Sequence, residues 1–264
     1  MVARRLALVL LAASLAGCVP STPPTASSPA ALPLGIVLMH GKKGPPRYLD
    51  DTKAAFEAHG YLVVTPEMCW SDKRQYDRLY PDCLTEIEAA VADLRQRGAR
   101  SIVVVGHSLG GSAAIAYGAT HDGVAGVIGF AAADAFFGPP SQLPDIARAQ
   151  YLVDEGKGDG PADFDDIRPS GRTSMRTTAA HFLSFVAPPA EQRTPAYAAR
   201  LHVPLLLIAG RQDSATMQYE ARIYDRVPNN ARNRYVEVNA DHNGILTAGM
   251  KPALEWLASL ESGS

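Results

Sequence analysis

Short apolar runs bounded by glycine, proline or polar residues recur along the chain from position 34 onward. Most are rich in Val, Ile and Leu, the composition of strands buried on both faces. The predicted strands are 34–39, 61–65, 101–106, 123–130, 203–209 and 234–238. This pattern predicts six strands, most of them in the interior of a sheet.

Stretches with helical periodicity lie between the predicted strands. The clearest is 82–97, with apolar residues at helical spacing and Gly98 as its end signal. Further helices are expected at 48–59, after Ser108, at 215–226 and at 245–260. Alternating buried strands and helices predict an α/β fold, with a mostly parallel sheet of about six strands and helices on both faces.

The alternation is interrupted between residues 131 and 200. This stretch contains Pro139 and Pro140, a run rich in Gly and Asp at 154–166, and one short helical pattern at 178–185. A long insertion without regular pattern, placed after a strand, is typical of a lid or substrate pocket. We therefore expect a small irregular lid at 131–200.

Length and charge narrow the possible classes of protein. The 264 residues are sufficient for one large domain with a substantial core. Its 25 basic and 27 acidic residues give a net charge of -2, without the basic excess expected of a nucleic-acid-binding protein. We expect no nucleic-acid partner.

The first 18 residues have the pattern of an export signal. Arg4 and Arg5 precede a short apolar run, 6–16, that is too short to span a bilayer. The segment ends in Leu15-Ala16-Gly17-Cys18, which resembles the lipobox of bacterial lipoproteins, in which the cysteine is lipidated. The resemblance implies a chain anchored to a bacterial membrane and facing the periplasm or the exterior. The alternative is an ordinary signal peptide with a chance cysteine.

Residues 19–33 are rich in Pro, Ser and Thr and cannot build a core, so they predict an extended tether. The predicted domains are thus the signal peptide 1–18, the tether 19–33 and a folded domain 34–264. With Cys18 assigned to lipid, Cys69 and Cys83 remain as an even pair in an exported protein, which favours a disulfide over two free thiols.

One stretch has the pattern of a nucleophile. The apolar run 101–106 leads into Gly106-His107-Ser108-Leu109-Gly110, which matches G-x-S-x-G, and a small-residue helix follows. In this motif the serine lies on a sharp strand-to-helix turn, which requires small residues two positions before and after it. Ser108 is the predicted nucleophile.

A serine needs a base and an acid that orients it, and in parallel sheets reactive groups gather at the carboxyl ends of strands. Asp213 directly follows the predicted strand 203–209, and His242 follows the last predicted strand. Asp134, after the strand 123–130, is the alternative acid, whereas Asp241 adjoins the base and should point away from it.

None of the other six histidines is the expected base. His107 should point away on the turn, and His40 should hold its loop by hydrogen bonds. The others are assigned to a helix end, loops and the lid: His59, His121, His181 and His202.

The oxyanion of an acyl-transfer intermediate needs hydrogen-bond donors. The expected donors are the backbone N–H of Leu109, which follows the nucleophile, and that of Lys42 in the loop after the first strand. The side chains of Lys42 and Lys43 are either solvated charges or would favour anionic substrates. We expect no cofactor and no metal.

Together, His40-Gly41, the motif at Ser108, Gly210-Arg-Gln-Asp213 and Asp241-His242 resemble the α/β-hydrolase superfamily of serine esterases and lipases. The resemblance implies the α/β-hydrolase fold without its first hairpin, and hydrolysis of a small-molecule or lipid-like acyl substrate. Serine rather than aspartate at position 108 argues against the branches of the superfamily that use a carboxylate nucleophile. A non-catalytic binding module and a serine peptidase are the alternatives.

Overall fold

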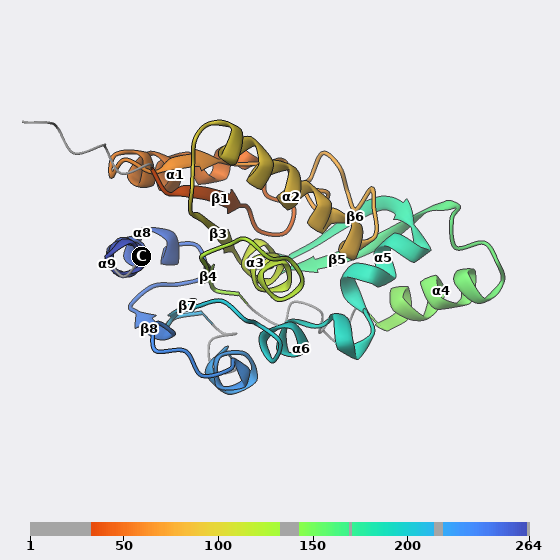
Figure 1. Cartoon of the computed structure of the whole chain (residues 1–264). Coiled ribbons are helices and arrows are strands. Elements are labelled where there is room, and N and C mark those ends of the chain that lie inside the picture. Colours follow the sequence, from red (N-terminus) through yellow and green to blue (C-terminus); the bar gives the residue numbers. More distant parts are fainter. Residues whose placement is uncertain (1–32, 133–142, 169–170, 214–218, 263–264) are drawn as a thin grey trace, which may run out of the picture. The chain divides into compact units, whose positions relative to one another are not determined.

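The computed structural model describes residues 33–132, 143–168, 171–213 and 219–262, and Figure 1 shows their arrangement. All of the elements below belong to one unit of the chain, Leu32–Ser264. Within the described ranges, no helix is both long and apolar enough to cross a bilayer.

The core of the domain is one parallel sheet of six strands. Its strands, in spatial order, are β2 (Leu62–Val64), β1 (Gly35–Met39), β3 (Ile102–His107), β4 (Gly126–Phe130), β7 (Leu205–Gly210) and β8 (Arg234–Val238). Every neighbouring pair is parallel. The four inner strands are buried throughout, because helices cover both faces of a parallel sheet. The predicted fold class is confirmed.

Neighbouring residues of β4 face opposite helix layers. A side chain at Gly126 would meet Trp256 in α9 (Met250–Glu261), whereas Val127 packs against Gly118 in α3 (Leu109–Thr120). Figure 1 shows α3 and α9 on opposite sides of β4 and β7. The layer with α3 also contains α2 (Tyr80–Gln96) and α6 (Thr194–Ala198), and α1 (Asp50–Glu57) contacts α9.

The insertion is more regular than the sequence predicted. It contains α4 (Leu143–Asp154), an antiparallel hairpin of β5 (Pro161–Arg168) and β6 (Gly171–Thr178), and α5 (Ala179–Val186). The prediction of an irregular lid is wrong here because the hairpin is polar along most of its length, so the run of aspartates had the composition of a loop. Residues 133–142, with both prolines, lie outside the described residues.

Two predicted helices are interrupted. The stretch expected at 245–260 divides at Gly249 into α8 (Ile245–Ala248) and α9, and a side chain at Gly249 would lie 2.9 Å from Phe130. The chain is therefore pressed against the sheet at this point.

The stretch expected at 215–226 appears as the short α7 (Tyr219–Arg222) and a 3₁₀ turn (Tyr224–Arg226), and 214–218 lie outside the described residues. The stretch expected at 48–59 begins as a 3₁₀ turn (Pro46–Leu49) before α1.

The loop between β2 and α2 is fixed to the domain by the predicted disulfide, which joins Cys69 in the loop to Cys83 in α2. Trp70 and Tyr76 of this loop are fully buried. The Tyr76 ring stacks on Phe185 of α5, with centroids 3.9 Å apart. The loop is therefore part of the core and contacts the insertion.

Candidate active site

Ser108 lies on a strained turn between β3 and α3. Its φ of 55° and ψ of -120° are outside the regions that L-residues ordinarily occupy. The turn is tight: a side chain at Gly106 would lie 2.1 Å from the Gly110 carbonyl, and one at Gly110 would lie 2.6 Å from the Met39 carbonyl oxygen. Both glycines of the motif are therefore needed for steric reasons. The Ser108 N–H donates to Phe130 of β4, which fixes the turn to the sheet.

Asp213 and His242 are brought together by the ends of two neighbouring strands. Asp213 follows β7 in a turn closed by its own N–H to the Gly210 carbonyl, and His242 lies in the loop after β8. The Nδ1–H of His242 donates to Asp213 Oδ2 over 2.6 Å. The Asp213 side chain is 5% exposed and that of His242 is 28% exposed. This short charge-assisted bond is formed by a buried carboxylate and a ring that reaches solvent.

The sequence did not identify Tyr219 as a site residue. Its hydroxyl donates to the same Asp213 Oδ2 over 3.0 Å, and the ring is buried. Burial, together with the Asp213 charge, raises the pKa of Tyr219 well above its ordinary value, so the phenol is a permanent donor. No sequence motif contains this tyrosine, and its contact with Asp213 becomes visible only in the folded chain.

The nucleophile and the base are not hydrogen-bonded to each other. In the described part of the chain, no bond joins the Ser108 hydroxyl to the His242 ring. Such bonds are often long in the absence of substrate and tighten when substrate binds.

His107 does not point away from the site, and that prediction is wrong. Its Nε2–H donates to the His242 carbonyl oxygen over 2.7 Å, and the two imidazole rings lie 4.8 Å apart. The strained backbone at Ser108 explains the error, since period-two alternation along a strand does not continue through this turn. Burial lowers the pKa of His107 to about 4, and the ring is therefore neutral near neutral pH.

His40 holds the loop after β1 by hydrogen bonds, as predicted. The His40 Nε2 accepts the Met68 N–H over 3.1 Å, so its Nδ1 carries the proton and donates to the Gly41 carbonyl. The indole of Trp70 donates to the His40 carbonyl, and the Lys43 N–H donates to the Trp70 carbonyl. The loop between β2 and α2 thus fixes the loop after β1.

This arrangement leaves two N–H groups available beside Ser108. A side chain at Gly41 would lie 3.2 Å from Ser108 Cβ, so the chain passes directly over the nucleophile. Among the described residues, neither the Lys42 N–H nor the Leu109 N–H donates to a protein acceptor. Leu109 also begins α3, whose N-terminus favours an anion.

The Lys42 side chain is neither a solvated charge nor free for an anionic substrate. Its Nζ lies 2.5 Å from Oδ1 of Asp166 in β5, and that carboxylate is fully buried. Neither Asp166 oxygen has a further hydrogen-bond partner among the described residues. The Lys43 side chain is also buried, with Asp72 at 4.0 Å.

The other acids and histidines weighed for the site are not placed beside Ser108 by the described part of the structure. Asp134 falls outside the described residues, and Asp241 caps its own loop by accepting the N–H groups of Asn243 and Gly244. The other histidines have contacts elsewhere: His59 with Ala55 on α1, His121 with Thr120 at the end of α3, and His202 with Asp122. His181 begins α5 in the insertion. The geometry therefore favours Asp213 and His242.

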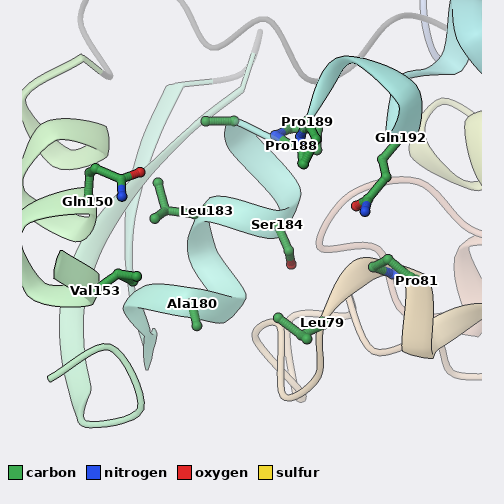
Figure 2. A pocket seen from close by; sticks show the side chains of 11 residues that line it. Leu79, Pro81, Gln150, Val153, Ala180, Leu183, Ser184, Pro188, Pro189 and Gln192 are labelled. Carbon is green, nitrogen blue, oxygen red and sulfur yellow. The ribbon is translucent and has the colours of Figure 1, made fainter. Parts of the chain in front are cut away.

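A pocket of about 320 Å³ lies between α4, α5 and the start of α2 (Figure 2). Leu183 and Ser184 of α5 line one side of it, and Leu79 and Val153 face them from other elements. None of its lining residues belongs to the group around Ser108, so we do not assign the substrate to it. No group of three metal-ligating side chains occurs among the described residues.

The model of the alpha/beta hydrolase family matches residues 4–249 of the chain. No curated protein matches it significantly. Among solved structures, it is similar to one from work on two metagenome-derived lipolytic enzymes (TM-score 0.64, 19% identity, covering 86% of this chain and 94% of the other). It is also similar to a Paleococcus ferrophilus monoacylglycerol lipase (TM-score 0.64, 18% identity, covering 86% of this chain and 94% of the other). A third similar structure is Est1E from Butyrivibrio proteoclasticus (TM-score 0.56, 20% identity, covering 87% of this chain and 90% of the other).

Proposed function

Because the chain belongs to the alpha/beta hydrolase family, we propose that it is a serine hydrolase that cleaves carboxylic esters or thioesters through an acyl-enzyme. Membership supports hydrolase activity in general, and a fold alone does not name a reaction. The observation that carries the proposal is the 2.6 Å bond from His242 to Asp213, beside a serine in a strained turn.

The direction of that bond determines which nitrogen of His242 acts as the base. Since Nδ1 carries the proton donated to Asp213, Nε2 of the neutral ring is the free acceptor. In the proposed reaction the Ser108 Oγ attacks the acyl carbon and its proton passes to His242 Nε2. His242 then gives that proton to the leaving group, and the acyl-enzyme forms. A water molecule, deprotonated by the same nitrogen, releases the acid and restores Ser108.

The negative charge that develops on the acyl oxygen needs donors, and we assign the N–H groups of Lys42 and Leu109 to it. Both belong to backbone that is already held in place, so little reorganisation is needed when the charge appears. Loss of one such donor typically lowers the rate by about 10²- to 10³-fold.

A fluorophosphonate probe tests the nucleophile directly. We expect it to label the wild type and not Ser108→Ala, and we expect His242→Ala to remain folded while losing hydrolysis of p-nitrophenyl acetate. Unchanged labelling of Ser108→Ala would refute the assignment. Ser112→Ala is the control, because Ser112 is a serine in the helix α3 that directly follows Ser108, and this variant should keep its label.

The alternatives make different predictions in the same assays. A folded wild type that neither takes up the probe nor hydrolyses any ester would indicate a non-catalytic binding module. Faster cleavage of peptide amides than of esters would indicate a peptidase. Similar structures include a monoacylglycerol lipase and lipolytic enzymes, so a p-nitrophenyl ester series of increasing acyl length is the measurement that defines the substrate.

We also propose that the protein is exported and anchored by lipid on Cys18. The supports are the lipobox-like sequence, the Pro-rich tether and the disulfide, since disulfides persist in oxidising compartments. Cys18→Ser should move the protein from the detergent phase to the aqueous phase in a detergent partition. An unchanged partition would contradict the anchor.

A further inference from the structure

We propose that His107 is a positioning residue: through its hydrogen bond to the His242 carbonyl, it holds the base in register with the nucleophile. The inference rests on the proposed function, because it takes Ser108 and His242 as the reacting pair. Neither the motif nor the family resemblance gives a role to the residue before the serine.

The bond that carries the inference has a fixed direction. A carbonyl oxygen can only accept, so His107 Nε2 bears the proton that bridges the 2.7 Å to His242. His107 is buried, 3% exposed, and its Nδ1 has no partner among the described residues. The ring therefore makes one hydrogen bond, and that bond is directed to the base.

His242 is thus held at two separate points. Asp213 holds the ring through Nδ1, which leaves the rest of the residue free to shift, and His107 holds the main chain through the carbonyl. The flanking residues of the loop are held by contacts to other elements. Gln212 donates to Ala240, and Tyr48 donates to Asn243.

The sequence position of His107 gives this bond its significance. His107 is covalently joined to Ser108, and the N–H of Ser108 is bonded to β4. One dipeptide therefore fixes the nucleophile and also the backbone of the residue that must take its proton. A displacement of about 1 Å in such a pair can cost on the order of 100-fold in rate.

The surroundings of His107 keep its ring in place. A side chain at Gly41 would lie 3.3 Å from His107 Nδ1, and the Tyr48 ring lies on another side at 5.7 Å between centroids. The depressed pKa keeps the ring neutral, which is favourable when the neighbouring His242 becomes a cation during the reaction. A charged His107 would oppose that step.

The test removes or replaces the hydrogen-bond donor of His107 with side chains that still occupy much of the space of the imidazole ring. In His107→Gln the amide nitrogen is separated from Cα by the same number of bonds as Nε2 of histidine, so it can still donate to His242. In His107→Asn the amide nitrogen is one bond closer to the backbone and falls short, and His107→Met has no donor. His202→Asn, at an exposed position, is the matched control.

We expect kcat for p-nitrophenyl acetate to fall about 10- to 100-fold in the Asn and Met variants, with KM within about twofold. The Gln variant should remain within about fivefold of the wild type, since one hydrogen bond is replaced by another. The rate of fluorophosphonate labelling should follow the same order. Each variant is assayed well below its own melting temperature, so loss of fold is not counted as loss of positioning.

Equal losses in the Gln and Asn variants, or wild-type kcat in the Met variant, would overturn the inference and leave the proposed function intact. A rise in KM with unchanged kcat would also overturn it, because that would place His107 in substrate binding. If the Met variant does not fold, the comparison of Gln with Asn decides. A wild type without esterase activity or probe labelling overturns the proposed function and this inference together.

Discussion

At the scale of single residues, the turn at Ser108 depends on the two glycines of its motif, because a side chain at Gly106 or Gly110 would overlap the neighbouring backbone. This requirement is local, so the motif that makes Ser108 the proposed nucleophile could be recognised in the sequence. His107 and Tyr219 were misjudged or missed because their partners are more than a hundred residues away or across a turn. A pattern along the chain does not contain such contacts.

The Tyr219 hydroxyl should stabilise the Asp213 carboxylate. In Tyr219→Phe we expect the free energy of unfolding to fall by about 1.5–3 kcal/mol, the usual contribution of a hydrogen bond to a charged group. Activity should fall only a few fold, because the bond from Asp213 to His242 remains. Asp213→Asn should lower kcat by about 10⁴-fold, since an amide favours the wrong tautomer of His242. Urea unfolding and ester hydrolysis measure the two effects, and a Tyr219→Phe loss as large as that of Asp213→Asn would contradict this division.

Stability should depend on pH through His107. Its pKa is lowered from 6.5 to about 4 by burial and by the neighbouring His242. Between these values the unfolded chain binds the proton and the folded chain does not, so stability falls as pH drops from 6.5 to 4. The wild type should lose about 1.4 kcal/mol per pH unit more than His107→Gln in this range. Parallel stability curves from urea unfolding at pH 4 to 7 would show that the ring is not held neutral.

At the scale of elements, prediction succeeded for the strands and failed for the hairpin. The four inner strands of the sheet are apolar because both of their faces are covered, and this pattern is visible in each run of sequence. The β5–β6 hairpin buries only a few positions, such as Phe164 and Met175. Its exposed positions are polar, and these hid the strand alternation.

The hairpin is tied to the loop that carries the assigned oxyanion donor. The Lys42 side chain pairs with Asp166 of β5, and the backbone N–H of the same residue is the donor that we assign to the oxyanion. On the other strand, the Thr177 hydroxyl donates to the Tyr76 carbonyl. The insertion therefore supports the donor loop through these two contacts.

Asp166→Asn should disturb both stability and catalysis. Removal of one partner from a buried ion pair typically costs about 3–5 kcal/mol, because the other charge is left uncompensated. We also expect kcat to fall by about 10-fold or more as the Lys42 N–H shifts. Asp163→Asn is the matched control, since the Asp163–Arg176 pair is exposed and should contribute at most about 1 kcal/mol. Wild-type kcat in folded Asp166→Asn would show that the hairpin does not position the donor.

At the scale of the whole molecule, the architecture followed from the alternation of elements, and the connections between distant segments did not. The sequence placed Cys69 and Cys83 in one disulfide from their number. It gave no indication that the loop containing Cys69 supports the donor loop through His40 and Trp70. The disulfide therefore fixes a loop that also holds the loop with the assigned oxyanion donor.

Replacing both Cys69 and Cys83 with Ser should have two effects, a lower free energy of unfolding and a lower kcat of the variant that remains folded. The disulfide closes a loop with a sequence separation of 14, so its loss should cost about 3 kcal/mol in urea unfolding. Because Met68 and Trp70 hold the donor loop, we also expect kcat to fall at temperatures where the variant remains folded, with KM little changed. Dithiothreitol should reproduce the effect in the wild type and have none on the double variant. A folded variant with wild-type kcat would show that the hydrogen bonds to His40 hold the donor loop without the disulfide.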